Sequence, residues 1–160
     1  MSVVVMEATP ARTLVDPAFF ERLSLRVAQS HGLDQERAEA VTDQAIAYLA
    51  TCAQKPEDAP PLFMSRAVDP AWHAFLEYTR EYDTFFASHG WPKVNHNPCD
   101  GFGGKIYPPA ADVLPLTVAA IESAGFRVAP ELWEEGADCG DTCGDDGGGG
   151  NPLPTCEHSN

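Results

Sequence analysis

The chain has 160 residues, with 24 Asp or Glu against 10 Lys or Arg, which gives a formal net charge of −14. Because an acidic surface repels phosphate groups, this balance argues against nucleic acid and anionic membranes as partners. No apolar run approaches the roughly 18 residues of a transmembrane helix, and no signal-peptide pattern is found, so a cytoplasmic protein is expected.

Hydrophobic spacing predicts a mainly α protein, a small four-helix domain with a long irregular loop and a Gly/Cys-rich tail. Residues 1–14 lack periodicity and are expected to form a flexible arm, while residues 15–135 carry the helical patterns. Residues 136–160 form an acidic tail that cannot fold by burial alone, so a metal ion could order it. More than half of the net charge lies in the last 30 residues, which contain 8 acidic residues and no Lys or Arg.

The first two helices are predicted from their ends. Asp16-Pro17, an N-cap followed by a first-turn proline, indicates the start of the first helix, and Gly32 indicates its end. Asp34 is expected to cap the second helix, which ends before Pro56. The buried face of this second helix is predicted from residues that recur every three or four positions, namely Ala38, Val41, Ala45, Leu49 and Cys52.

A third helix is expected from Asp69-Pro70, again an N-cap and a first-turn proline, to His89-Gly90. This helix holds most of the aromatic side chains and is predicted to be the centre of the core. Its inner face comprises Trp72, Phe75, Leu76, Thr79, Tyr82 and Phe86.

The remaining elements are a loop, a fourth helix and a short turn. Residues 91–109 are rich in Gly, Pro and Asn without any period, which predicts an irregular loop. Asp112 is expected to cap the fourth helix, and Gly125 is expected to end it. Residues 130–133 are predicted to form a final helical turn.

The first candidate metal group comprises Asp69, His73, His96 and Cys99. Residues four apart share a helix face, and a loop folded over the helix start would bring His96 and Cys99 beside Asp69. Imidazole, carboxylate and thiolate ligands suit Zn²⁺ or another transition metal. Two alternatives stay open, a structural hydrogen-bond network around a capping Asp69 and a catalytic role without a metal. If the group binds a metal ion or forms the hydrogen-bond network, we expect the His73 and His96 side chains to lie within about 5 Å of each other.

The second candidate metal group lies in the tail and comprises Cys139, Cys143, Cys156 and His158. Four soft ligands within 20 residues, in a segment without a core, are typical of a small structural zinc site. The alternatives are a disordered tail with incidental thiols and a disulfide between two of the cysteines.

The third predicted helix has the sequence VDPAWHAF over residues 68–75 and TREY over residues 79–82. These strings resemble the motifs of the glycine-rich domain-containing protein-like family. The resemblance covers residues 35–143 and implies a helical fold rather than a particular reaction. Where many relatives have paired histidines, this chain has Asn95-His96. The site candidates that remain in place are Asp69, His73 and His96.

Together these features predict a soluble helical module that binds a metal ion, with Zn²⁺ as the cofactor, or that binds a protein partner. The alternative is a small metal-dependent enzyme centred on His73 and His96, in which the ion keeps an open coordination position. A concave pocket beside an open site would favour the enzyme, whereas a closed four-ligand site would favour the module.

Overall fold

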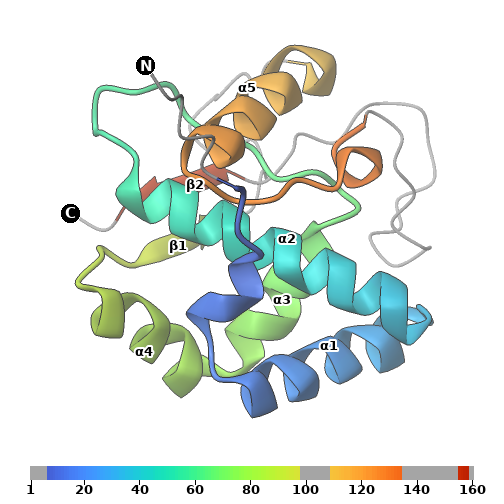
Figure 1. Ribbon diagram of the computed structural model, residues 1–160. Coiled ribbons are helices and arrows are strands. Elements are labelled where there is room, and N and C mark those ends of the chain that lie inside the picture. The colour runs from blue at the N-terminus through green and yellow to red at the C-terminus, as the bar shows by residue number, and fades with distance from the viewer. Residues whose placement is uncertain (1–6, 98–108, 135–154, 159–160) are drawn as a thin grey trace.

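The computed structural model describes residues 7–97, 109–134 and 155–158. This part of the chain is mainly α, as predicted (Figure 1). Its helices are η1 (Ala11–Leu14), α1 (Pro17–His31), α2 (Gln35–Gln54), α3 (Asp69–Glu77), α4 (Thr79–His89), α5 (Ala110–Ser123) and η3 (Pro130–Leu132), where η marks a 3-10 helix. Its strands are β1 (Val94–Asn97) and β2 (Thr155–His158).

Helix α2 crosses the middle of the molecule, with α1 and α4 on one side and α5 on the other (Figure 1). It contacts α1, α3, α5 and both strands. The aromatic side chains of α3 and α4 pack in this centre. Trp72 is fully buried, and its ring centroid lies 5.6 Å from that of Tyr48 on α2. The core therefore forms where the predicted aromatic face meets α2.

The helix ends follow the local sequence signals. The Asp16 carboxylate accepts hydrogen bonds from the backbone N–H groups of Ala18 and Phe19, at 3.0 and 3.1 Å. Asp34 caps α2 in the same way. Gly32 ends α1 at φ 62°, a left-handed conformation that glycine adopts without a side-chain clash. The predicted boundaries of the first two helices are confirmed.

The predicted third helix is divided at Tyr78, where ψ changes to 65°. On one side of this break lies α3 and on the other α4, so the described chain has five α-helices where four were predicted. The break accompanies a tertiary contact. Trp72 Nε1 donates a hydrogen bond of 3.0 Å to the Tyr82 hydroxyl, whereas residues ten apart in one straight helix are separated by about 15 Å along its axis.

Replacing Tyr82 with phenylalanine tests this arrangement. The Tyr82 hydroxyl accepts from Trp72 and donates to the Val94 carbonyl at 2.7 Å. Its loss would remove one hydrogen bond from each of two buried groups, so we expect Tyr82→Phe to lower the free energy of unfolding by about 1–3 kcal/mol in urea melts. Tyr78→Phe is the matched control and should change it by less than about 0.5 kcal/mol. Equal effects of the two variants would contradict the role assigned to the hydroxyl.

Strands β1 and β2 form an antiparallel ladder in which His96 is opposite Cys156 and Val94 is opposite His158. This finding corrects the prediction of irregular structure at residues 94–97, while residues 98–108 of the predicted loop lie outside the described residues. The Asn-His-Asn sequence of β1 has little intrinsic β preference, and the partner strand lies about 60 residues away in the chain. Neither feature allows a strand to be recognised locally.

The segment predicted as a flexible arm packs on the domain from Thr9 onward. Thr9 forms a parallel bridge with Phe126, and the Arg12 backbone N–H donates to the Asp43 carboxylate at 2.8 Å. A 3-10 helix of four residues is too short to produce a visible hydrophobic period, which is why the sequence did not indicate it.

Helix α5 begins three residues earlier than predicted. It starts at Ala110 after Pro109, so Asp112 lies in the first turn and is not the cap. Thr117 ties the helix to the connection before α3. Its hydroxyl donates to the Phe63 carbonyl at 2.9 Å and accepts from the Phe63 N–H at 3.0 Å.

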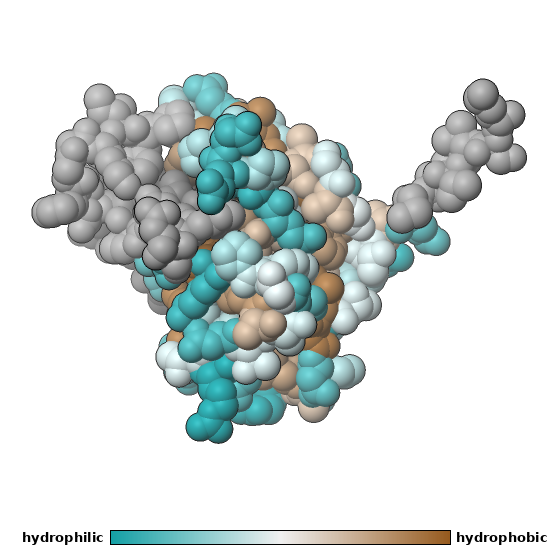
Figure 2. Space-filling model, turned by 90° about the vertical axis from the view of Figure 1, so that its left-hand side faces the viewer, coloured by the Kyte–Doolittle hydropathy of each residue, from teal (hydrophilic) through white to brown (hydrophobic). Residues whose placement is uncertain are grey.

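Hydrophilic side chains cover much of the face shown in Figure 2, with hydrophobic ones between them. Among the described residues, the large hydrophobic side chains that are exposed are Leu25 on α1 and Leu116 on α5. They lie on different helices and mark no docking face for the predicted protein partner. None of the described helices combines the length and the apolar character needed to cross a bilayer.

Candidate metal centre

Asp69 is the first residue of α3, and the connection before the helix fixes its position. The backbone N–H groups of Val68 and Asp69 donate to the Ser65 carbonyl at 3.2 and 3.0 Å. The Ser65 hydroxyl in turn donates to the Leu132 carbonyl. The predicted role of Asp69 as the N-cap is therefore wrong, since Val68 occupies that position and Ser65 accepts the first N–H groups. The Asp69 carboxylate is left for other partners.

This carboxylate lies between two imidazoles. Asp69 Oδ2 is 3.2 Å from His73 Nε2, one turn further along α3, and Asp69 Oδ1 is 3.6 Å from His96 Nε2 on β1. The His73 and His96 ring centroids are 4.5 Å apart with an interplanar angle of 90°, which confirms the predicted approach. One ligand atom from each of the three residues lies within 4.8 Å of the other two, so the group could hold a metal ion.

Two core contacts position His96. Its ring lies edge-on to Trp72, with the centroids 4.4 Å apart. The strand that carries it is held by the hydrogen bond from Tyr82 to Val94, two residues earlier. These supporting roles of Trp72 and Tyr82 were missed by sequence reasoning, because the helical pattern indicates only that both residues face the core.

Two of the ligand atoms are buried without a hydrogen bond. Within the described part of the chain, neither Asp69 Oδ1 nor His96 Nε2 has a hydrogen-bond partner. Their separation of 3.6 Å is too long for a hydrogen bond to each other. An unsatisfied buried polar group costs about 1–3 kcal/mol of stability. Two such atoms close to each other therefore suggest that a further group binds between them. A cation bound by both atoms would satisfy them.

The distances fit such a cation. Two ligands at about 2.0–2.1 Å from a tetrahedral zinc ion lie roughly 3.3–3.4 Å apart. The contacts from Asp69 to His73 and His96, at 3.2 and 3.6 Å, bracket this value. The two contacts use different oxygens of Asp69, and one ligand atom from each residue lies within 4.8 Å of the others, so side-chain movements that bring these atoms to the zinc spacing would let them bind an ion.

The charges of the group are set by opposing effects. Burial alone would raise the pKa of Asp69, but the interactions with His73 and His96 outweigh it and hold that pKa below its usual value. The hydrogen bond to Asp69 raises the pKa of His73, against the opposing effect of burial. Burial and the nearby His73 lower the pKa of His31, at the end of α1. Asp69 is therefore the anion of the group at neutral pH, and His31 is a neighbour that the sequence did not reveal.

These shifts predict how the stability of chelator-treated protein depends on pH. The raised pKa of His73 means that its contribution is present below the unfolded value of about 6.5 and is lost as the pH rises through the folded value. The lowered pKa of Asp69 means that its contribution is lost only as the pH falls below about 3.8. We therefore expect wild-type protein to exceed His73→Gln in stability by more at about pH 5.5 than at about pH 8.5. Urea melts at the two pH values measure this, and a larger difference at the higher pH would contradict it.

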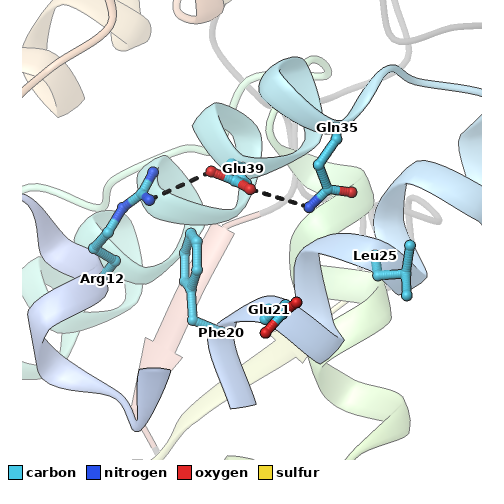
Figure 3. A pocket seen from close by; sticks show the side chains of 6 residues that line it. All are labelled: Arg12, Phe20, Glu21, Leu25, Gln35 and Glu39. Carbon is cyan, nitrogen blue, oxygen red and sulfur yellow. Dashed lines mark hydrogen bonds and ion pairs between the residues drawn. The ribbon is translucent and has the colours of Figure 1, made fainter. Parts of the chain in front are cut away.

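A surface hollow of about 340 Å³ lies away from this group, between η1, α1 and α2 (Figure 3). It is lined by Arg12, Phe20, Glu21, Leu25, Gln35 and Glu39. Three of its polar groups pair with one another, since Glu39 contacts Arg12 at 3.4 Å and accepts from Gln35 at 3.1 Å. No member of the Asp69, His73 and His96 group lines this hollow, so it offers no substrate cavity beside the candidate metal ligands.

The other predicted ligands lie wholly or partly outside the described residues. Cys99, Cys139 and Cys143 fall outside them altogether. Cys156 and His158 lie in β2, where the backbone is described and the side chains are not. The tail zinc site therefore stays a prediction. Cys52, predicted as a buried small residue, is buried in α2.

Comparison of the chain with protein-family models, with curated proteins and with solved structures found no match. The resemblance to the glycine-rich domain-containing protein-like family therefore stays a prediction. What can be said about function rests on the geometry of Asp69, His73 and His96.

Proposed function

We propose that this protein binds one divalent transition-metal ion through Asp69, His73 and His96, and that zinc is the ion for which the donor set is suited. The observation that carries the proposal is a pair of buried atoms, Asp69 Oδ1 and His96 Nε2, which lie 3.6 Å apart and have no hydrogen-bond partner among the residues that the structure describes. A bound ion would join the start of α3 to β1. It would act as a structural element of a helical metal-binding module.

The ligand chemistry supports zinc over the common hard cations. Two imidazoles and one carboxylate suit Zn²⁺, whereas Mg²⁺ and Ca²⁺ prefer sites built from oxygen atoms. The start of a helix carries a positive partial charge, which disfavours a cation. Asp69, ionised and only 11% exposed at its side chain, offsets this effect at short range.

The surroundings favour the module over the metal-dependent enzyme. A catalytic metal needs an open position next to a cavity that admits a substrate. His96 is only 14% exposed at its side chain, and the hollow of Figure 3 lies elsewhere. The His73 side chain is 50% exposed, so water can reach the site from that side.

A zinc titration tests the proposal. The protein would carry Cys139→Ser and Cys143→Ser, so that the predicted tail site cannot form, and would be freed of metal with a chelator. We expect one zinc ion to bind per chain. At a free concentration 100 times the dissociation constant, it should stabilise the fold by about 2.7 kcal/mol. Mg²⁺ at the same concentration should have no effect. Absence of binding and of a shift in the unfolding midpoint would contradict the proposal.

A further inference from the structure

We propose that the hollow between η1, α1 and α2 binds a small organic cation, an ammonium or guanidinium group carried on a short apolar stem. Its volume of about 340 Å³ is at the small end of the range for ligand sites. The hollow is separate from the candidate metal centre, so this binding would be a second property of the protein that does not depend on zinc. Both the polar and the apolar parts of the lining fit such a ligand.

The N–H groups in the hollow serve the protein itself. Gln35 Nε2 donates to the Ser24 hydroxyl and to the Glu39 carboxylate, both at 3.1 Å, which uses its two hydrogens. The Arg12 guanidinium contacts Glu39 at 3.4 Å and Asp43 at 3.7 Å, so two carboxylates offset its positive charge. An anionic ligand would therefore gain little in this hollow.

The oxygen acceptors, in contrast, are in excess. A carboxylate can only accept, so the bond to Glu39 fixes the Gln35 amide with Nε2 toward Glu39 and Oε1 away from it, on the side where Leu25 lies (Figure 3). Among the described residues, no donor contacts this oxygen or the carboxylate of Glu21. One neutral and one charged acceptor are thus available to the N–H groups of a ligand.

Arg12 shows how the hollow holds a cation. Its guanidinium carbon lies 4.4 Å from the centroid of the Phe20 ring, which is an attractive cation–π arrangement, while its Nη1 contacts Glu39. A second cation of the same kind would find a similar combination of apolar and acidic groups beside it. Here the apolar part is Leu25, which is 47% exposed, and the acidic part is Glu21.

Helical spacing places these two groups together. Glu21 and Leu25 are four residues apart on α1, so they share one face of the helix. An apolar stem that covers Leu25 would place its charged end one turn away, beside the Glu21 carboxylate. A short stem of a few carbon atoms therefore suits the site, and burial of Leu25 adds a hydrophobic contribution to that of the charges.

Charge favours an organic cation over an anion or a simple metal ion. Two glutamates and one arginine line the hollow, and the whole chain has a formal net charge of −14, so cations are attracted to it. Two carboxylates are too few for the oxygen-rich shells that Ca²⁺ and Mg²⁺ require. A metal ion would also leave the apolar part of the lining unused.

An NMR titration of the full chain tests the inference, with butylguanidinium as the probe and butylurea as its neutral counterpart of the same shape. We expect butylguanidinium to shift the backbone amide signals of Glu21, Leu25 and Gln35 and to saturate in the millimolar range. Butylurea should bind at least about tenfold more weakly, because it cannot form charge-assisted hydrogen bonds to a carboxylate as a cation.

Two variants locate the binding. Glu21→Gln should weaken butylguanidinium binding about fivefold, as expected for loss of a partly exposed ion pair. Glu122→Gln, which removes the same charge from α5, should leave the affinity unchanged. Because Glu21 is exposed, its replacement should not disturb folding, and unchanged amide signals elsewhere in the spectrum would verify this.

Three results would overturn the inference. Equal binding of butylurea would show that the hollow does not select a cation. Shifts that spread over the acidic surface and are the same in Glu21→Gln would show a non-specific attraction. The lack of any saturable shift around the hollow would show that it binds neither compound. Each of these results would leave the proposed zinc site untouched, because Asp69, His73 and His96 do not line the hollow.

Discussion

Replacing Trp72 with alanine is expected to lower the free energy of unfolding by about 3–5 kcal/mol, because it removes a fully buried indole from the centre of the core. The ring contacts Tyr48 on α2 and His96 on β1, and its N–H donates to the Tyr82 hydroxyl. The substitution would thus remove packing from three elements at once. It would also leave the Tyr82 hydroxyl without its donor. Urea melts monitored by circular dichroism measure the loss.

Trp91→Ala is the matched control for Trp72→Ala. Trp91 is only partly buried, and its ring stacks on the His89 ring at 4.3 Å near the surface. Its removal should cost less than half as much as the removal of Trp72. A loss below about 1 kcal/mol for Trp72→Ala would show that α3 does not anchor the core.

The second large effect is expected at the metal centre. Asp69→Asn keeps the shape of the side chain and removes its charge, so zinc affinity should fall by at least 100-fold, or about 2.7 kcal/mol. The carboxylate is the sole anion among the three described ligands and is placed between the other two. Competition with a chromophoric chelator, in the background without Cys139 and Cys143, measures the change.

Asp83→Asn is the control for Asp69→Asn. Asp83 pairs with Lys93 at 2.6 Å on the surface, with 61% of its side chain exposed. Its loss should leave zinc affinity unchanged within about twofold, because exposed charges are well screened. A variant Asp69→Asn that lowers the stability of chelated protein but keeps full zinc affinity would support the structural hydrogen-bond network in place of the metal site.

The parts of the fold that the sequence predicted are those with local causes. Asp16, Gly32 and Asp34 act within one helical turn of their own positions, so their roles could be deduced from neighbouring residues. No Pro or Gly next to Tyr78 indicates the break there. The break accompanies the hydrogen bond between Trp72 and Tyr82, which forms between residues of two different helices and is not visible in the local sequence.

The candidate site divides in the same way. The pair Asp69 and His73 follows from helical spacing, and the approach of His96 was expected from a loop that returns to the helix start. The position of His96 on a strand was not expected, because β1 has its partner far away in the chain. Ser65, which replaces Asp69 as the acceptor at the helix start, was missed because it lies in a Pro-rich connection without a period.

Anomalous diffraction from crystals grown with Zn²⁺, recorded on both sides of the zinc absorption edge, tests the central claim most directly. We predict an anomalous peak between Asp69, His73 and His96, about 2.0–2.2 Å from one atom of each residue. A fully occupied ion elsewhere in the protein, with Asp69 Oδ1 and His96 Nε2 still unbound to metal, would contradict the account.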